Sequence, residues 1–295
     1  MTALLEGLVI AHLGQGIAVE YDHKIILCQT LRRLDTIAVG DKVLWSLSSS
    51  DQGRIEEILP RRSLLERPSR NGKTRPVAAN IDTVFIVFAV EPNCDFLLID
   101  QYLAVCENRN IDVALVLNKT DLPQTAIIEK ELLDYKKLGY PLYRVSALGS
   151  SNIDELKNVL KGQVSMLAGQ SGVGKSSLTN AIIPDKDIKT NTVSATTKHG
   201  RHTTTATTLY HLTDGGYLID SPGVAIFGLA GLSEHQLAYG YREFQTHIDN
   251  CQFNDCRHLK DKGCAVVAAV DNGDISKTRY DRFLKLREKM PVTFI

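Results

Sequence analysis

The chain has 295 residues, of which 43% are hydrophobic and 23% are charged, as is typical of a folded globular protein with two or three domains. Lysine and arginine together number 34, as do aspartate and glutamate, so the chain is not a general polycation and any surface that binds nucleic acid must be local. The N-terminal residues lack the basic segment of a signal peptide, and no apolar run has the length of a membrane span. We therefore expect a cytoplasmic protein that binds no membrane.

The first 62 residues contain short β-like runs separated by turn residues, at 7–11, 16–20, 24–28 and 42–46. Four or five short strands with frequent turns predict a small β-barrel. An oligonucleotide-binding (OB) barrel is the favoured version. An SH3-like barrel is the alternative, and composition does not separate the two. We predict that residues 1–62 form the first domain.

A basic segment follows at 54–75. Asn71-Gly72 and two prolines predict a loop or linker there. Such a run is usually a solvated surface, but beside a barrel of the nucleic-acid-binding type it could contact phosphates, and the sequence leaves both interpretations open. The basic residues of this segment are Arg54, Arg61, Arg62, Arg67, Arg70, Lys73 and Arg75.

From residue 81 onward, patterns of buried strands alternate with patterns of helices. The predicted strands are 81–90, 111–117, 142–145 and 164–168, and the predicted helices between them are 95–108, 125–139 and 152–161. This alternation predicts an α/β domain with a mostly parallel sheet and helices on both faces, which we assign to residues 63–229. Ligand-binding loops in such sheets lie at the C-terminal ends of the strands.

The strand at 164–168 leads into a glycine-rich loop and a helix, with the P-loop pattern G-x-x-x-x-G-K-[ST]. Backbone N–H groups of such a loop surround phosphate oxygens, and the helix N-terminus adds partial positive charge. We expect Lys175 to reach the β- and γ-phosphates and the Ser176 hydroxyl to bind Mg²⁺. The residues predicted to hold the nucleotide here are Gly169, Gln170, Ser171, Gly172, Val173, Gly174, Lys175, Ser176 and Ser177.

Two other strand ends carry residues suited to guanine. Asn118-Lys119-Thr120-Asp121 follows the strand at 111–117, and Ser146-Ala147 follows the strand at 142–145. The carboxylate of Asp121 can accept both the N1–H and the 2-amino group of guanine, a pair of donors that adenine does not offer. A backbone amide after the second strand can meet the guanine O6. The sequence therefore predicts GTP and GDP as ligands.

Residues 191–205 are polar and rich in threonine, and Asp220-Ser-Pro-Gly223 follows a strand at 217–219. Together they resemble the two switch segments of GTPases. We expect Asp220 to act on Mg²⁺ through water, the Gly223 amide to contact the γ-phosphate, and Thr204 to complete the metal shell. The motif order is unusual, because N-K-x-D and Ser-Ala precede the P-loop and D-x-x-G comes last. This order indicates a circularly permuted GTPase domain.

Residues 230–295 are predicted to form a helical, zinc-binding domain. Cys251, Cys256, His258 and Cys264 supply three thiolates and one imidazole, a set that suits one tetrahedral structural zinc. The other three cysteines are scattered, which favours a reduced protein over a disulfide framework. Helices are expected at 233–246 and 276–289. The second of these presents either a solvated face or another RNA-facing surface, with Lys277, Arg279, Arg282, Lys285, Arg287 and Lys289.

With these motifs the chain resembles, over essentially its whole length, the family of the bacterial ribosome small-subunit-dependent GTPase A. The resemblance implies an OB barrel, one structural zinc, and GTP hydrolysis with Mg²⁺ that the small ribosomal subunit stimulates. It also implies a role in late maturation of the subunit. We further expect the protein to bind the subunit and its rRNA through its flanking domains and to be released according to nucleotide state. We expect a monomer.

The catalytic water requires a partner other than the residue after D-x-x-G. Ras-like enzymes have a glutamine at that place, whereas this chain has Val224. His202 is the catalytic candidate, because its imidazole can orient or deprotonate a water and because it matches the histidine of the family's G-R-H-T-T-T motif. Contact of His202 with rRNA or solvent is the alternative. For the whole protein, the alternatives are a P-loop ATPase or kinase and a non-catalytic, nucleotide-gated RNA-binding module.

Overall fold

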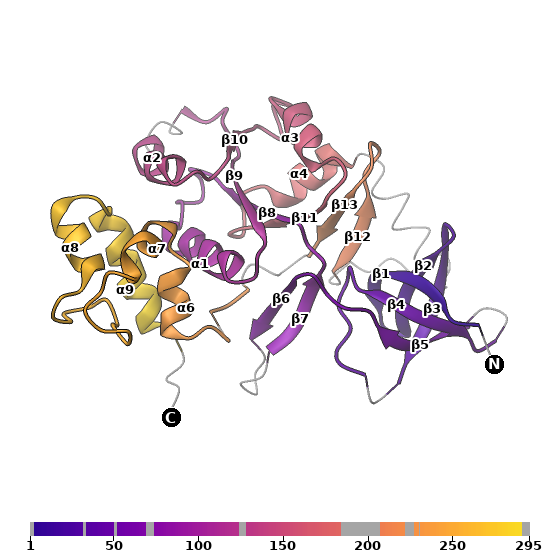
Figure 1. The fold of residues 1–295 in the computed structure, drawn as a ribbon. Coiled ribbons are helices and arrows are strands. Elements are labelled where there is room, and N and C mark those ends of the chain that lie inside the picture. Colours follow the sequence, from indigo (N-terminus) through magenta and orange to yellow (C-terminus); the bar gives the residue numbers. More distant parts are fainter. Residues whose placement is uncertain are drawn as a thin grey trace.

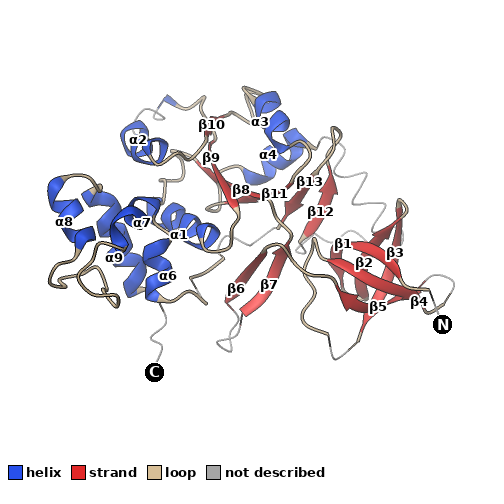
Figure 2. Ribbon diagram, in the orientation of Figure 1, coloured by secondary structure: helices blue, strands red, loops and turns tan. Residues whose placement is uncertain are grey.

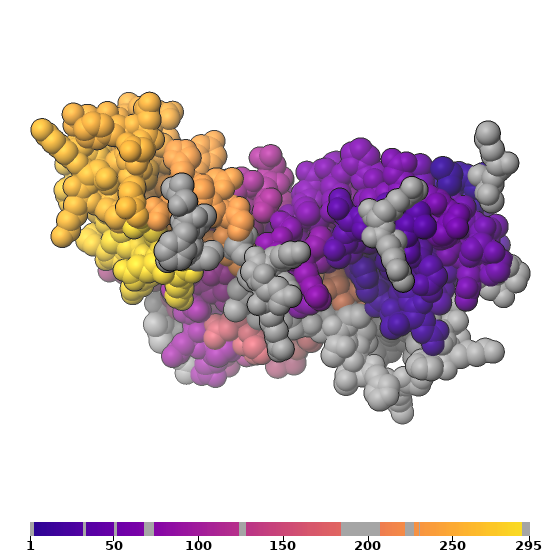
Figure 3. Space-filling model, turned by 90° about the horizontal axis from the view of Figure 1, so that it is seen from below, coloured from indigo at the N-terminus to yellow at the C-terminus, as the bar shows by residue number. Residues whose placement is uncertain are grey.

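The computed structural model has a barrel at one end and a group of helices at the other, with an α/β domain between them (Figure 1). The same two ends are separated when the molecule is viewed from below (Figure 3). Strands make up the barrel and the centre of the α/β domain, whereas the C-terminal end is helical (Figure 2). The structure describes residues 3–31, 34–49, 52–68, 74–123, 128–183, 207–221, 227–229 and 231–290.

The N-terminal strands close into a five-stranded barrel. Their order is β1-β2-β3-β5-β4 with β4 returning to β1, and only the β3–β5 pair is parallel. This Greek-key order is that of an OB-fold, so the favoured barrel is confirmed and the SH3-like alternative is wrong. Alternate residues such as Val9, Val19 and Trp45 fill the interior. The strands are β1 (Leu5–Leu13), β2 (Gly16–Tyr21), β3 (Lys24–Thr30), β4 (Lys42–Leu47) and β5 (Gln52–Ile58).

The predicted loop or linker at 54–75 is wrong for most of its length. The chain completes β5 and then forms a hairpin of β6 (Leu64–Pro68) and β7 (Thr74–Ala79). The hairpin's inner residues, among them Leu65 and Ala78, are fully buried, which stabilises paired strands despite the basic composition. Pro76 is tolerated because the pairing shifts register beside it, at a bulge between Leu65 and Glu66.

The central sheet has the order β10-β9-β8-β11-β13-β12, with all neighbouring pairs parallel except β13–β12. At its edge β12 also pairs with β1 of the barrel, so barrel and α/β domain share one eleven-stranded sheet. The strands are β8 (Thr83–Phe88), β9 (Asp112–Leu117), β10 (Leu142–Arg144), β11 (Val164–Ala168), β12 (Thr208–His211) and β13 (Tyr217–Asp220).

Helices cover both faces of this sheet, as predicted. Alternate residues of β8 belong to different cores: Ile86 packs with α1 (Phe96–Glu107) and α2 (Glu129–Lys137), whereas Phe85 packs with α3 (Ile153–Leu160) and α4 (Lys175–Ile182). Successive residues of a strand face opposite sides of the sheet. Because helices cover both sides, every residue of β8 is buried and its sequence is a nearly continuous apolar run.

Between residues 231 and 290 the structure describes four helices, whereas the sequence predicted two. The predicted helix at 233–246 is broken at Gly240, where the backbone passes so close to α1 that an added Cβ would lie 2.6 Å from Ala104 Cα. The helices are α6 (Glu234–Tyr239), α7 (Arg242–Ile248), α8 (Ala265–Asn272) and α9 (Lys277–Glu288). Among the described residues, no helix combines the length and the apolar character needed to cross a membrane.

The sequence left two interpretations of the basic residues of α9, a solvated face or an RNA-facing surface. Both are wrong for two of these residues. Arg279 and Arg282 are buried, with exposed fractions of 1% and 8%. Their guanidinium groups pair with Asp100 of α1 rather than facing solvent or RNA. The boundaries at residues 62 and 229 stay predictions.

Candidate nucleotide site and metal centre

The P-loop lies between β11 and α4, where its last glycine must pack against another motif. Gly174 caps α4 with φ of 94°, a left-handed conformation that favours glycine. An added Cβ would lie 2.3 Å from Asn118 Nδ2. Both the backbone angle and the close neighbour therefore require glycine at this position.

The Lys175 ammonium group lies over the P-loop backbone. Its Nζ donates to the carbonyl oxygens of Gly169 and Gln170, each at 2.7 Å. Burial lowers the pKa of Lys175, and the Asp220 carboxylate opposes that shift. The P-loop lysine and the aspartate at the end of β13 therefore share one electrostatic environment, as expected for neighbouring parallel strands that end at the same sheet edge.

Asn118 joins the three predicted nucleotide motifs. Its side chain is buried, with Nδ2 donating to Val173 O at 2.9 Å and Oδ1 accepting from Ala147 N at 3.1 Å. Lys119 extends across the same loop, with Nζ donating to Gly172 O at 2.8 Å and to Glu91 O at 2.7 Å. The N-K-x-D motif, which is far from the P-loop in sequence, thus contacts it directly, and the Ser146-Ala147 segment is joined to it through Asn118.

Asp121 is exposed at the edge of this assembly and is oriented by Ser146. Ser146 Oγ donates to Asp121 Oδ1 at 2.5 Å and accepts from Gly149 N at 2.9 Å. The hydrogen bond from Ser146 holds the pKa of Asp121 below its ordinary value, so this carboxylate is ionised at neutral pH. Thr120 contributes its backbone, its N–H donating to Val145 O at 3.2 Å.

The remaining predicted residues fall into two groups. The structure places Ser176 and Ser177 in the first turn of α4, both exposed, and Asp220 at the C-terminal end of β13. His202, Thr204 and Gly223 lie outside the described residues.

Sequence reasoning missed Glu91 and Gly149, whose backbone groups bond Lys119 and Ser146. Both positions follow predicted strands, so the rule that ligand loops occupy the C-terminal ends of parallel strands could have indicated them.

The predicted metal ligands come together in the C-terminal part. One ligand atom from each of Cys251, Cys256, His258 and Cys264 lies within 4.8 Å of all the others. His258 Nδ1 is 3.7 Å from Cys251 Sγ and 3.6 Å from Cys264 Sγ. Tetrahedral zinc with Zn–S bonds of ~2.3 Å and Zn–N bonds of ~2.0–2.1 Å separates sulfur from nitrogen by roughly 3.6 Å. The cluster therefore has the ligand types and spacings of a zinc site.

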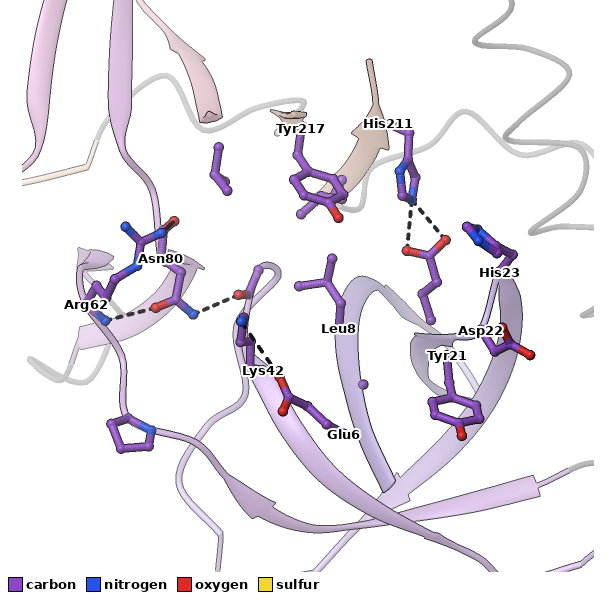
Figure 4. Close-up of a pocket in the computed structure, with 16 residues that line it drawn as sticks. Glu6, Leu8, Tyr21, Asp22, His23, Lys42, Arg62, Asn80, His211 and Tyr217 are labelled. Carbon is purple, nitrogen blue, oxygen red and sulfur yellow. Dashed lines mark hydrogen bonds and ion pairs between the residues drawn. The ribbon is translucent and has the colours of Figure 1, made fainter. Parts of the chain in front are cut away.

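A cavity of about 820 Å³ lies between the barrel and the edge strands of the α/β domain (Figure 4). A hydrogen-bonded pair and an ion pair line it: His211 of β12 bonds Glu20 of β2, and Lys42 faces Glu6 within the barrel at 3.7 Å. Asn80, which donates to Gly40 O at 2.9 Å, closes the side toward the hairpin. The cavity is lined by residues of the barrel, of the segment after it and of the edge strands of the sheet, so it lies where these parts of the chain meet.

Comparison with known proteins agrees with the nucleotide motifs that meet at this sheet edge. The model of the RsgA GTPase family matches residues 58–230, more than half of the chain. The chain belongs to the RsgA GTPase family. The chain is accordingly a GTP hydrolase, and the alternative of an ATPase or kinase is not favoured.

Relatives match nearly the whole chain. A protein of Hahella chejuensis called small ribosomal subunit biogenesis GTPase RsgA is 40% identical, covering 98% of this chain and 86% of the relative. The protein of the same name from Haemophilus influenzae is 42% identical with the same coverage. These relatives support the family assignment from the barrel to the cysteine cluster.

Two solved structures are similar to the chain over nearly its whole length. YjeQ from Thermotoga maritima superposes with a TM-score of 0.78 at 31% identity, covering 99% of this chain and all of the other. YloQ, described as a circularly permuted GTPase, gives 0.73 at 27% identity, with 99% and 98% coverage. The circular permutation predicted from motif order is thereby confirmed.

Proposed function

We propose that this GTPase acts in biogenesis of the small ribosomal subunit, that the subunit stimulates its GTP hydrolysis late in maturation, and that nucleotide state controls its release. One structural observation carries the enzymatic part: Asn118 bonds both the P-loop and the Ser146-Ala147 segment, so the phosphate and guanine motifs form one site. The names of the relatives support the ribosomal part.

In this proposal GTP lies along the sheet edge with its phosphates over the N-terminus of α4. The phosphates replace the loop carbonyls as partners of Lys175, whose ammonium group already lies there. Ser176 and Thr204 would supply oxygen ligands to Mg²⁺, Asp220 would act on the metal through water, and the Gly223 amide would contact the γ-phosphate. When bound, Mg²⁺ neutralises charge on the transferring phosphate. Both assigned donors are oxygen ligands, the type that Mg²⁺ prefers.

The base is held at the other end by Asp121 and the loop after β10. Asp121 accepts the two guanine donors, the Ala147 amide meets O6, and the aliphatic part of Lys119 lies beside the ring. The ordering of Asp121 by Ser146 before the nucleotide binds supports this assignment, because a pre-oriented carboxylate loses less entropy on binding.

One zinc ion, held by Cys251, Cys256, His258 and Cys264, has a structural role. Four protein ligands close the tetrahedron and leave no position for a substrate. The loop that carries the ligands has little other regular structure, so metal binding supplies folding free energy. The barrel and the C-terminal part contact rRNA of the subunit in the cytoplasm, and the protein acts as a monomer.

Turnover measured with and without purified small subunits tests the proposal. We expect slow hydrolysis alone and a large rise with subunits. A protein that binds GTP but hydrolyses none under either condition would instead be the non-catalytic RNA-binding module. Asp121→Asn provides the matched variant: GTP binding should weaken by about 1.5–3 kcal/mol, the magnitude of a charged hydrogen bond, and xanthine nucleotides should bind better.

A further inference from the structure

The hydroxyl groups of Thr207 and Ser221 meet at the edge of the sheet where the nucleotide motifs gather. Thr207 Oγ1 lies 2.7 Å from Ser221 Oγ, and Ser221 is 6% exposed. Thr207 directly precedes β12, and Ser221 directly follows Asp220 at the end of β13. This hydrogen bond therefore joins the start of one strand to the residue next to the carboxylate assigned to magnesium.

The backbone fixes the same place from two sides. Thr208 pairs with Asp220 of β13 on one side and with Ala11 of β1 on the other. At its far end β12 is held again, because His211 Nε2 lies 2.8 and 2.9 Å from the two carboxylate oxygens of Glu20 in β2 (Figure 4). Strand β12 is thus anchored to the barrel at both ends and to β13 along its length.

The Thr207–Ser221 hydrogen bond extends the connection between β12 and β13 beyond the last backbone pair. The ladder between the two strands ends at the Thr208–Asp220 pair, and the hydrogen bond joins the next residue on each strand. Removing this hydrogen bond loosens the residue that directly follows Asp220, and the position of Asp220 relative to the nucleotide site is then less well fixed. A change of this kind alters the reacting geometry more than the strength of nucleotide binding, because small misplacements reduce rate strongly.

We propose that Thr207 and Ser221 are positioning residues for GTP hydrolysis. They hold Asp220 in the orientation that hydrolysis requires, and the pairing of β1 with β12 holds Thr207 in place. The proposal rests on the function proposed above in one respect, the assignment of Asp220 to the magnesium side. Neither hydroxyl is required to touch the nucleotide; both act through Asp220.

Subunit-stimulated turnover of two variants tests this. Thr207→Val keeps the shape of the side chain and removes its hydroxyl, and Ser221→Ala removes the partner. For each we expect kcat to fall about tenfold, the effect of a lost hydrogen bond whose partner stays unpaired, with KM and GDP affinity within about twofold of the wild type. The double variant should lose no more than either single variant, since all three lack the same hydrogen bond.

Two comparisons separate positioning from a merely structural role. Thr207→Ser keeps the hydroxyl and should recover most of kcat. Thr213→Val removes a hydroxyl of the same kind from the exposed turn after β12 and should leave kcat unchanged. Thermal unfolding of each variant shows whether the fold is intact.

The inference is overturned if both variants keep full turnover, or if KM rises while kcat is kept. It is also overturned if Thr207→Ser stays as slow as Thr207→Val, or if the losses of the two single variants add in the double variant. A lower kcat that comes with an equal loss of GDP affinity and of unfolding temperature also overturns it, because that pattern marks general destabilisation. Wild-type protein without turnover overturns the proposed function together with the inference, so the two failures are distinguishable.

Discussion

The guanidinium group of Arg279 lies against the carboxylate of Asp100, with both side chains almost completely buried. Arg279 belongs to α9 and Asp100 to α1, so their contact joins the C-terminal helices to the α/β domain. The second oxygen of Asp100 accepts from Arg282 Nε at 2.6 Å, and Glu243 accepts from Arg279 Nε at 2.7 Å. The buried charges are therefore balanced within one network.

Removal of Asp100 from this network should destabilise the protein strongly. Asp100→Ala leaves two buried guanidinium groups short of a partner, and breaking a buried pair in this way costs about 3–5 kcal/mol. Urea unfolding measures the loss. The control is Asp281→Ala, which breaks the exposed Lys277–Asp281 pair on α9. This change should cost less than about 1 kcal/mol of unfolding free energy. Similar losses in the two variants would show that the buried network contributes no more than a surface pair.

The same network shows where sequence reasoning stopped. Arg279 and Asp100 are 179 positions apart, and spacing along α9 gives no information about a partner on α1. The basic composition of α9 therefore suggested solvent or RNA, whereas tertiary contacts bury two of its arginines. The close approach of Gly240 to α1 is likewise a tertiary contact that the local sequence pattern does not reveal.

The nucleotide site was largely predictable because its signals are local. Each motif directly follows a strand with a clear apolar pattern, and parallel strands bring their C-terminal ends together. This rule places the residues after β9 and β11 at the same sheet edge, where Asn118 contacts Val173. The β6–β7 hairpin was not predicted, because Pro76 and the surrounding charges concealed the apolar residues Leu65 and Ala78.

The hydrogen bond from Ser146 to Asp121 predicts a pH dependence of GTP binding. A lowered pKa means that binding to this carboxylate is fully present above the ordinary pKa of an aspartate and is lost only as the pH falls through the lowered value. Ser146→Ala removes the main cause of the shift, so GTP affinity should begin to fall at a higher pH in this variant. Titration of GTP affinity from neutral pH down to about one unit below the ordinary pKa of an aspartate, which is about 3.9, measures the difference. Superimposable pH profiles would show that Ser146 does not tune Asp121.

The cysteine cluster predicts that purified protein contains about one zinc per chain. Cys256→Ser should lower the zinc content and increase hydrogen exchange between residues 231 and 290, while GTP binding stays largely intact, since metal binding at such a site is coupled to local folding. Cys94→Ser, outside the cluster, is the control and should keep its zinc. Protein prepared without chelator that contains no zinc would contradict the assignment.

The final prediction concerns the catalytic water. Val224 follows the D-x-x-G motif and can neither donate nor accept a hydrogen bond through its side chain, so another group must orient the attacking water. His202 has a suitable imidazole and lies in the segment that precedes β12 in sequence. His202→Ala should therefore lower subunit-stimulated turnover by about 10²-fold or more, the usual contribution of a general base, while GTP affinity is kept.

His202→Gln separates the two ways in which the imidazole can act. Glutamine can orient a water, as it does in Ras-like enzymes, but it cannot take up a proton at neutral pH. Partial recovery of turnover in His202→Gln would assign the histidine to orienting the water, whereas no recovery would assign it to proton transfer. Full stimulated turnover in His202→Ala would instead remove the histidine from catalysis and favour its contact with rRNA or solvent. Measuring subunit binding for all three proteins ensures that a lower rate does not arise from a weaker complex.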